Sequence, residues 1–172
     1  MLPSRLALLL ATPLLLPACV AMPLLPSAEA AGPPFELAEF FTGRLEGEGV
    51  LDVMMSGSRR IRVSSVGSKE PDGSIVLVQK IRQEGKPART RDWRLREVAP
   101  GRYAGTLSDA EGPVTATASG QRLHIAFRTR GGMDVDQWLT LAPGGRSARN
   151  VLRVRRFGLT VAALDETIRK LN

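Results

Sequence analysis

The sequence contains few of the residues from which metal and disulfide sites are built. Among 172 residues it has one histidine, His124, and one cysteine, Cys19. Protein zinc sites draw most of their ligands from several histidines and cysteines, and a lone cysteine has no intramolecular disulfide partner. The composition therefore predicts a domain without a metal site, a disulfide or a bound cofactor.

Sequence motifs of common enzyme classes are also missing. No Gly-x-Ser-x-Gly nucleophile elbow occurs, and the glycine pairs match neither the phosphate-loop nor the dinucleotide-binding pattern. A serine–histidine–aspartate triad would need His124 as its base, and the sequence contains no nucleophile motif to accompany this histidine. We therefore expect a protein that is not an enzyme and has no catalytic residues.

Aromatic residues are scarce, whereas basic residues are in excess. Aromatics make up 5% of the chain, and the formal net charge is +7. A basic nucleic-acid-binding surface usually gathers its Lys and Arg in one patch and offers aromatic rings for base stacking. Here the arginines are spread singly, so we expect no nucleic-acid partner. We interpret the basic residues as a solvated face or as a face that attracts the anionic surface of a cell envelope.

The first 30 residues have the three-part build of a secretory signal peptide. Arg5 supplies a positive charge, residues 6–16 are mostly apolar, and Ala28 and Ala30 are small residues at the positions read by a signal peptidase. Prolines interrupt the apolar run, so we predict no transmembrane span. We expect residues 1–30 to be a signal peptide and residues 31–172 to form one domain, exported to the periplasm as a monomer.

Cys19 offers an alternative processing site. Residues 16–19 read Leu-Pro-Ala-Cys, which resembles a bacterial lipoprotein cleavage site with a small residue before the cysteine that becomes lipidated. Pro17 is unfavourable there, so we favour cleavage after Ala30. A membrane-anchored lipoprotein, with lipidation at Cys19, is the alternative, and a purely apolar role for this cysteine is a third interpretation.

From Arg44 onward the pattern is that of successive strands. Apolar and polar residues alternate, and turn signals such as the Pro-Asp-Gly of residues 71–73 recur at short intervals. No long helical segment separates the strands, which excludes parallel crossovers. We predict an all-β fold, an antiparallel up-and-down β-barrel of eight to ten strands, since closure removes exposed edges.

The two ends of the domain break this pattern. Four apolar residues crowd the window Phe35–Phe41, which predicts one or two helical turns packed on the barrel. Leu164, Ile168 and Leu171 recur at helical spacing, with acids early and bases late, which suits the helix dipole. A short helix over Ala163–Leu171 is predicted, with a strand as the alternative.

A barrel of this size can enclose one small ligand. Small residues at Gly105, Ala116 and Ala118 lie on faces that alternate inward; they predict either a cavity or a narrow end. The aromatic residues are first of all core candidates, but in a hollow barrel they are the best wall residues because small-ligand pockets have aromatic walls with few polar groups. The candidate wall residues are Trp93, Tyr103, Phe127 and Trp138.

The segment Met133–Gly158 has the pattern of a charged β-hairpin. Asp134 and Asp136 lie on its first arm, and Arg153 and Arg155 lie on its second arm. Opposed across the hairpin, they would form carboxylate–guanidinium pairs. Such pairs either fix the strand register, which we favour, or grip the polar head group of a ligand.

Asn150 precedes these arginines on the second arm. Its side chain is a further candidate for binding a ligand, although a role in tying the turn after Gly145 is favoured.

The order of features resembles a bacterial family of exported proteins, many of them lipoproteins, known as domain of unknown function 3833. The matching residues are Phe40-Phe41-x-Gly43, Gly85, Arg91-x-Trp93, Gly101-x-Tyr103-x-Gly105, Asp136-x-Trp138, Asn150 and Phe157-Gly158. This resemblance implies export and a lipocalin-like barrel, and it implies no established activity. Gln137 stands where the family usually has a second acid, which argues against a catalytic acid pair.

Three functional hypotheses follow. The first is a non-catalytic barrel that binds a lipid or another small amphiphile, with Arg153 or Arg155 at the ligand's acidic head group. The second is a structural or interaction protein of the envelope with a filled barrel and a basic face on anionic surfaces. The third, and least favoured, is a hydrolase that uses Asp134 or Asp136, which would require a raised carboxylate pKa inside a cleft.

Overall fold

The computed structural model describes residue 20, residues 23–24 and residues 33–171. Cys19 and almost all of the predicted signal peptide lie outside the described residues, so export and lipidation stay predictions. Among the described residues, no helix combines the length and the hydrophobicity needed to cross a bilayer.

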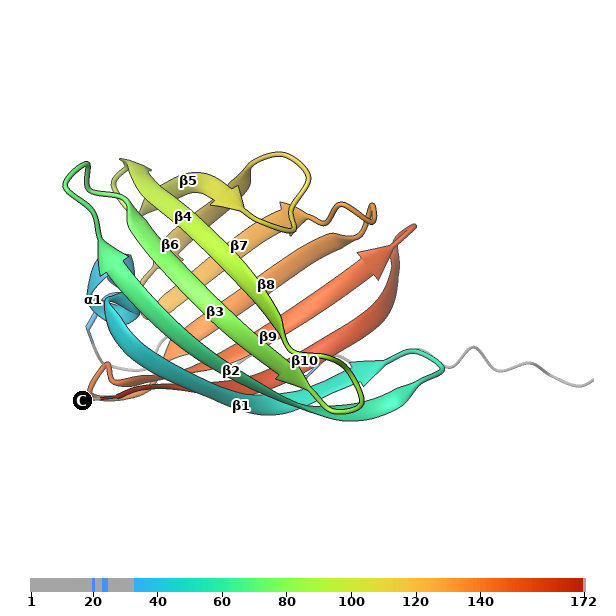
Figure 1. Cartoon of the computed structure of the whole chain (residues 1–172). Helices are drawn as coiled ribbons and strands as arrows, with labels where there is room; N and C mark the ends of the chain where they lie inside the picture. The colour runs from blue at the N-terminus through green and yellow to red at the C-terminus, as the bar shows by residue number, and fades with distance from the viewer. Residues whose placement is uncertain (1–19, 21–22, 25–32, 172) are drawn as a thin grey trace, which may run out of the picture.

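The domain is a closed antiparallel barrel in which each strand pairs with the next and the last strand pairs with the first (Figure 1). This confirms the predicted fold class. Its elements are α1 (Leu37–Phe41), β1 (Gly43–Val53), β2 (Gly57–Lys69), β3 (Ile75–Gln83), β4 (Arg89–Ala99), β5 (Arg102–Leu107), β6 (Val114–Ser119), β7 (Arg122–Arg128), β8 (Asp134–Leu141), β9 (Ser147–Arg156) and β10 (Leu159–Lys170).

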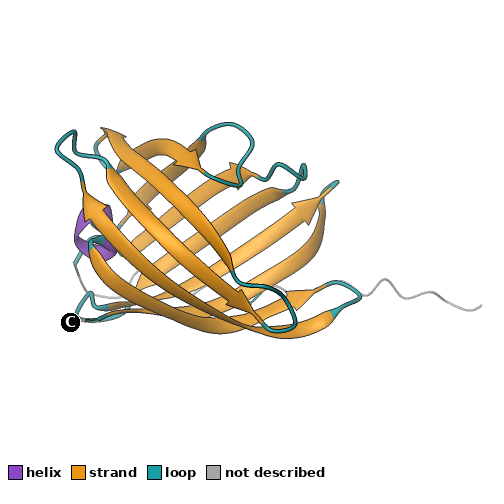
Figure 2. Cartoon of the chain, in the orientation of Figure 1, coloured by secondary structure: helices purple, strands orange, loops and turns teal. Residues whose placement is uncertain are grey.

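The short helix α1 closes one end of the barrel (Figure 2). Its Leu37, Phe40 and Phe41 are buried, and Phe35 just before it is buried too. The Phe35 amide donates a hydrogen bond to the carbonyl of Gly120 (2.8 Å), which fastens the segment to the turn between β6 and β7. The helical turn predicted from the crowded phenylalanines is therefore confirmed, and it serves as the floor of the barrel.

The prediction of a C-terminal helix is wrong, because residues 159–170 form strand β10. This strand pairs with β9 on one side and with β1 on the other, and it thereby closes the barrel. Leu164, Glu166 and Ile168 all face inward at a spacing of two, and Glu166 is only 4% exposed. A charged residue at an inward position interrupted the alternation that marks a strand, so the apolar residues that remained matched helical spacing.

The barrel interior is packed unevenly along its axis. The main buried cluster contains the α1 residues and large side chains of β4 to β8, whereas a smaller cluster of Ile61, Val63, Ile81 and Leu164 lies on the wall formed by β2, β3 and β10. The two clusters do not merge into one continuous core. The space between the two clusters is a cavity, and it opens at the end of the barrel opposite α1.

Candidate functional site

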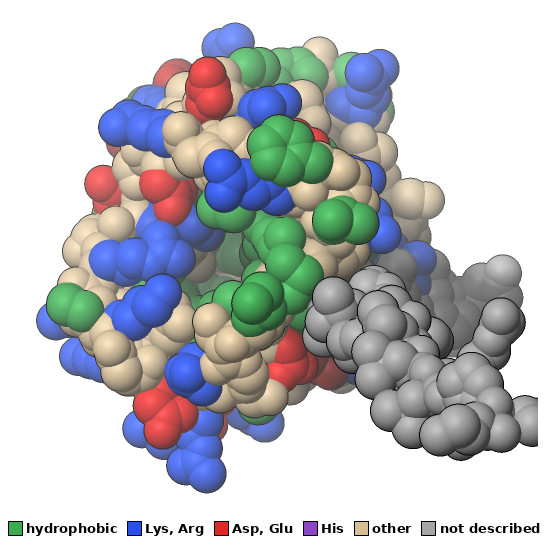
Figure 3. All heavy atoms as spheres, turned by 90° about the vertical axis from the view of Figure 1, so that its right-hand side faces the viewer, with side chains coloured by type: hydrophobic (Ala, Val, Ile, Leu, Met, Phe, Trp, Pro, Cys, Tyr) green, Lys and Arg blue, Asp and Glu red, His purple; other side chains and the backbone are tan. Residues whose placement is uncertain are grey.

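A cavity of about 620 Å³ occupies the barrel interior. Its lining includes Leu37 and Phe41 at the α1 end and Met54, Arg130 and Met133 at the opposite end. Figure 3 looks at that opposite end and shows a hollow surrounded by hydrophobic and basic side chains. The volume lies in the range of pockets that hold small molecules, so the barrel is hollow enough to bind one.

Most of the cavity wall is aliphatic. Strand alternation turns one side chain in two inward, and on the long strands the inward positions are mainly Leu, Ile and Val, as at Leu51, Ile81 and Leu152. Gly105, Ala116 and Ala118 do not line the cavity. An added Cβ at Gly105 would lie 1.8 Å from the Arg94 carbonyl oxygen, so this glycine permits a close approach of β4 and β5. These small residues therefore fit the narrow-end alternative.

One wall of the cavity carries an arginine, Arg91, whose side chain is 13% exposed. Nε and Nη2 of Arg91 both donate hydrogen bonds to Oδ2 of Asp109, at 3.0 and 2.6 Å. Its guanidinium carbon lies 5.8 Å from the ring centre of Trp93 and 5.9 Å from that of Phe127. Burial lowers the pKa of Arg91, and the charge of Asp109 opposes that shift. Oδ1 of Asp109 is buried and has no hydrogen-bond partner among the described residues.

A chain of hydrogen bonds continues along this wall. Nε1 of Trp93 donates to Oε1 of Gln79 (2.6 Å), and Nε2 of Gln79 donates to Oγ of Ser65 (3.3 Å). The three residues lie on neighbouring strands β4, β3 and β2, so their inward positions form a polar row across the barrel. The row orients the Trp93 ring against Phe127, whose ring centre is 5.6 Å away at an almost perpendicular angle.

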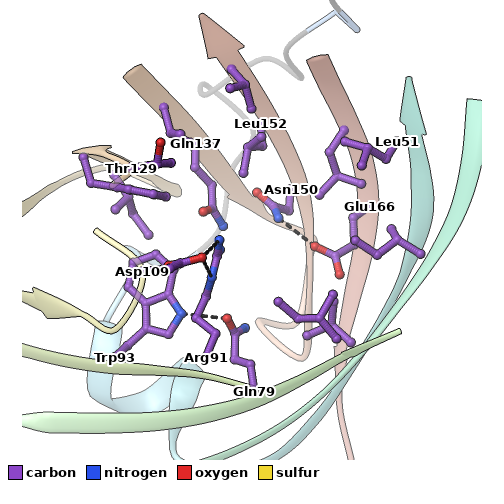
Figure 4. A pocket seen from close by; sticks show the side chains of 18 of the residues that line it. Leu51, Gln79, Arg91, Trp93, Asp109, Thr129, Gln137, Asn150, Leu152 and Glu166 are labelled. Atoms are coloured by element: carbon purple, nitrogen blue, oxygen red, sulfur yellow. Dashed lines mark hydrogen bonds and ion pairs between the residues drawn. The ribbon is translucent and has the colours of Figure 1, made fainter. Parts of the chain in front are cut away.

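The opposite wall carries a buried carboxyl group. Nδ2 of Asn150 donates a hydrogen bond to Oε2 of Glu166 (2.7 Å). Oδ1 of Asn150 and Oε1 of Glu166 are buried and have no partner among the described residues. Burial raises the pKa of Glu166, and the hydrogen bond from Asn150 opposes that shift. Figure 4 shows this pair on the side of the cavity that faces Arg91 and Asp109.

A glycine makes room for the Glu166 carboxyl group. An added Cβ at Gly47 of β1 would lie 2.0 Å from Oε1 of Glu166. A second space of about 10 Å³ lies beside this carboxyl group and is bordered by Ser65 and Gln79, a volume close to that of one bound water. The two polar walls therefore approach each other at this point, and polar groups form a belt part of the way around the cavity.

Two of the predicted wall residues, Trp93 and Phe127, line the cavity. Asn150, a candidate ligand contact for which a role in a turn was favoured, lines it too and donates a hydrogen bond to Glu166. Tyr103 is buried in the core and does not line it, so its predicted role as a wall residue is wrong. The pKa of Tyr103 is raised by burial and by the nearby carboxylates of Glu97 and Glu36.

The charged residues of the predicted hairpin and Trp138 lie on the outer face of the barrel, so the alternative in which they bind a ligand in the cavity is wrong. Because Val135 and Leu139 of β8 are buried inside, alternation directs the side chains between them outward. The same argument applies to β9, where Asn150 and Leu152 line the cavity. The residues corrected in this way are Asp134, Asp136, Trp138, Arg153 and Arg155.

On the outer face, Asp136 is the centre of a compact ion-pair cluster. Its carboxylate lies 3.0 Å from Nε2 of His124, 3.3 Å from Arg153 and 2.9 Å from Arg155. Burial acts to raise the pKa of Asp136, but the three partners together lower it by more, so the net shift of the pKa is downward. The predicted pairing of β8 acids with β9 arginines is thus confirmed for Asp136. That these pairs fix the strand register stays a prediction.

Two other outer-face residues complete this cluster or lie beside it. Trp138 stacks on His124, with ring centres 5.1 Å apart, and the guanidinium carbon of Arg153 lies 5.2 Å from the Trp138 ring centre. Asp134 pairs with Arg128 of β7 at 3.6 Å instead of with the β9 arginines. Both oxygens of the Asp136 carboxylate are thus paired within the sheet, whereas Nε of Arg153 and Nε of Arg155 have no partner among the described residues.

The site also contains residues that the sequence analysis did not select. They are Gln79, Arg91, Asp109, Gln137 and Glu166. Arg91 had a usable signal, because it is two residues from Trp93 and so shares its face. Glu166 had none, since its segment matched a helix, and Asp109 lies in a loop where alternation gives no information.

The site can hold an organic ligand by apolar contact and by hydrogen bonds to the polar belt. Among residues 33–171 and the three described residues before them, no three His, Cys, Asp or Glu side chains are grouped as metal ligands would be. The chemistry available is therefore that of aliphatic contact, three guanidinium groups, two carboxyl groups and several amides.

Comparison with known proteins places the fold among lipocalin-like barrels. The S-type phycobiliprotein lyase CPES from Guillardia theta superposes with a TM-score of 0.61 at 9% identity, over 80% of this chain and 94% of that chain. A DUF3598 family protein of unknown function from Nostoc punctiforme superposes with a TM-score of 0.56 at 13% identity, over 86% of this chain and 52% of that chain. At these identities the likeness concerns the fold alone.

Among curated proteins, no sequence matches this one. The family model described as "Protein of unknown function (DUF3833)" matches residues 14–170, which include every strand of the barrel and agree with the resemblance drawn from its motifs. The chain therefore belongs to the DUF3833 family.

Proposed function

We propose that this protein binds a small amphiphile inside its barrel and carries out no chemistry on it. The observation that carries the proposal is the cavity of about 620 Å³ with a mainly aliphatic wall and a partial belt of buried polar groups. Apolar surface in such a cavity gains about 25 cal/mol for each Å² removed from water. A ligand with an apolar body and a few polar atoms matches this lining.

The polar groups indicate what those few atoms should be. Arg89, Arg91 and Arg130 line the cavity, and Asp109 is the acid beside two of them. Glu166 is the other acid of the lining, and burial raises its pKa. Positive charge thus exceeds negative charge along the lining, which favours an acidic head group.

The unpartnered oxygens add a second requirement. Oδ1 of Asn150 and Oε1 of Glu166 are buried acceptors, and a buried acceptor without a donor costs about 1–3 kcal/mol. A hydroxyl or amide N–H on the ligand would satisfy one of them. The proposed ligand is therefore an acidic amphiphile with at least one hydrogen-bond donor, and Arg91 takes the head-group role first given to Arg153 or Arg155.

Neither alternative function has this support. A structural protein with a filled barrel would leave no such cavity. A hydrolase using Asp134 or Asp136 would need a raised carboxylate pKa inside a cleft, whereas Asp136 lies on the outer wall with a lowered pKa.

We further propose that the barrel acts in the periplasm, with the lipoprotein anchored through Cys19 as the alternative. The support is the leader pattern of residues 1–30. Labelling cells with a fatty-acid tracer distinguishes the two. Label on the wild type that is lost in Cys19→Ser establishes the anchor, and an unlabelled wild type establishes simple export.

The binding proposal is tested by purifying the protein from its host without detergent, extracting it under denaturing conditions and analysing the extract by mass spectrometry. We expect an acidic amphiphile in near-stoichiometric amount. A Leu152→Trp variant, which fills part of the cavity, is the control and should yield much less. Equal extracts from both proteins, or an empty wild type, would contradict the proposal.

A further inference from the structure

Two hairpin tips at the open end expose large apolar side chains. Met55, between β1 and β2, is 93% exposed, and Phe157, between β9 and β10, is 91% exposed. Both have positive φ, 64° and 50°, and they are the described non-glycine residues for which this is so. Each tip thus combines a backbone conformation that costs free energy in a non-glycine residue with apolar surface left in water.

The Phe157 tip is the more unusual of the two. Arg156 and Leu159 pair directly, so Phe157 and Gly158 form a two-residue loop, and both have positive φ. This is the pattern of a type I′ turn, in which Asn-Gly is the preferred dipeptide. Folding alone would favour asparagine at residue 157. The Phe157 ring contacts the guanidinium group of Arg156, whose carbon lies 5.4 Å from the ring centre, but it is not buried in the barrel, which indicates a further contact outside the barrel.

The two tips are neighbours at the cavity mouth. The Met54 amide donates a hydrogen bond to the Val161 carbonyl (2.9 Å), which joins the β1–β2 turn to the start of β10. Met54 and Val161 themselves line the cavity, and Leu159 beside them is 62% exposed. The apolar tips therefore project from the rim through which a ligand would enter, at the end opposite α1 (Figure 1).

Arginines accompany both tips. Residues 52–60 and 155–160 contain four arginines and one acid, Asp52. Within the described part of the chain, Arg59, Arg60 and Arg156 form no salt bridge, whereas Arg155 is paired with Asp136. Figure 3 shows basic and hydrophobic side chains close together around this hollow. Exposed apolar groups flanked by arginines that form no salt bridge are the combination that binds an anionic lipid surface.

We propose that the barrel docks its open end on an anionic phospholipid bilayer, with Phe157, Met55 and Leu159 inserted among the lipids and the flanking arginines at the phosphate level. This proposal rests on the proposed amphiphile-binding function. Docking places the cavity mouth against the bilayer, which is the source or the destination of the ligand. Two narrow tips suit insertion between lipids, whereas a stable protein interface needs about 800 Å² of surface from each partner.

The test is flotation of the protein with lipid vesicles. Every buried core residue lies between Phe35 and Ile168, so a protein that begins at Ala31 retains the whole barrel and removes the apolar leader from the measurement. Vesicles of phosphatidylglycerol mixed with phosphatidylcholine provide the anionic surface, and vesicles of phosphatidylcholine alone provide the neutral control. We expect binding to the anionic vesicles that weakens at high salt.

The decisive variant is Phe157→Asn. Asparagine suits the turn, so this variant should fold at least as well as the wild type, which a thermal melt verifies. Its partition onto anionic vesicles should fall about tenfold, because the main inserting side chain is gone. Val98→Asn is the matched control, since Val98 is 58% exposed near the end of β4 by α1 and should not affect binding.

Binding of a soluble fluorescent amphiphile, 1-anilinonaphthalene-8-sulfonate, is measured in parallel without vesicles. Unchanged dye binding in Phe157→Asn, together with lost vesicle binding, supports the docking surface. Equal vesicle binding by both proteins overturns it, even if the dye still binds and the cavity function stands. Self-association or protein binding through Phe157 in place of vesicle binding also overturns it, in favour of a protein partner.

Discussion

The inner and outer walls of this barrel each carry a tryptophan, arginines and a carboxylate, yet the two sets differ in how completely their carboxyl groups are paired. On the outer wall, Asp136 contacts His124, Arg153 and Arg155. On the inner wall, Asn150 and Glu166 each keep a buried oxygen without a described partner. The Asp136 carboxylate outside is thus fully paired, although Nε of Arg153 and Nε of Arg155 have no partner among the described residues, whereas the Glu166 carboxyl group inside is only partly paired.

This difference shows why charge alone is a poor guide to a binding site. The outer cluster is conspicuous in the sequence because its members alternate along one hairpin, but its partners use up its carboxylate within the sheet. The inner groups come one or two from each of several strands and retain capacity for a ligand. A site is better recognised by unsatisfied buried groups around a space than by the density of charges.

The largest contrast should be between the two tryptophans. Trp93→Ala removes a buried ring that packs on Phe127 and bonds Gln79, and it should lower the free energy of unfolding by about 3 kcal/mol. Trp138→Ala removes a half-exposed ring stacked on His124 and should cost about 1 kcal/mol. Urea unfolding of both variants checks this. Equal costs would mean that the two walls are packed alike.

The next contrast concerns the arginines. Arg91→Met should weaken binding of 1-anilinonaphthalene-8-sulfonate about tenfold, or about 1.4 kcal/mol, because the sulfonate loses its cation in the cavity. Arg153→Met changes the outer wall and should leave dye affinity unchanged. A fluorescence titration compares them, and the account fails if the outer variant shows the larger loss.

A smaller effect is expected at Gly47. Gly47→Ala places a methyl group against the Glu166 carboxyl group and should destabilise the fold by about 1 kcal/mol, since the carboxyl group must move. Gly131→Ala is the control, because its added Cβ would lie 3.7 Å from the nearest atom, Oγ1 of Thr129. Thermal melts should show a lower melting temperature for Gly47→Ala than for Gly131→Ala. An unchanged melting temperature in Gly47→Ala would show that the carboxyl group is free to move.

The subtlest contrast is in the pH dependence of stability. The pKa of Glu166 is raised, so its contribution is fully present below the ordinary value of 4.5 and is lost as the pH rises through the raised value. The pKa of Asp136 is lowered, so its contribution is present above the ordinary value of 3.8 and is lost as the pH falls through the lowered value.

Urea midpoints measured across pH test these opposite signs. Glu166→Gln should gain stability relative to the wild type as the pH rises above 4.5, whereas Asp136→Asn should lose stability relative to the wild type over the neutral range and approach it in acid. If the urea midpoints of the two variants, relative to the wild type, changed with pH in the same direction, the environments assigned to Glu166 and Asp136 would be contradicted.

Much of the fold could be predicted because its inward positions are mostly apolar. Strict alternation and short turns identified an antiparallel barrel, and Phe35–Phe41 identified the helical floor. The prediction failed at β10 for a reason tied to the site itself. Glu166 faces inward, and a carboxyl group in place of an apolar residue removed the strand pattern from that segment.

The candidate site was predicted only in part. Trp93 and Phe127 were correctly selected as wall residues, and Asn150 was named as a candidate ligand contact. The ligand's head group was nevertheless assigned to Arg153 or Arg155 on the outer face, because local sequence does not show which charges are already neutralised. Arg91 and Asp109 meet only through the fold, since one lies on β4 and the other in the loop between β5 and β6.

The central claim is that the barrel interior is a binding cavity, and titration with 1-anilinonaphthalene-8-sulfonate tests it most directly when wild type and Leu152→Trp are compared. Leu152 lies on the cavity wall, and circular dichroism verifies that the variant keeps its fold. The account predicts one dye molecule bound per wild-type barrel and little binding to Leu152→Trp. Equal binding to both folded proteins, or none to the wild type, would contradict it.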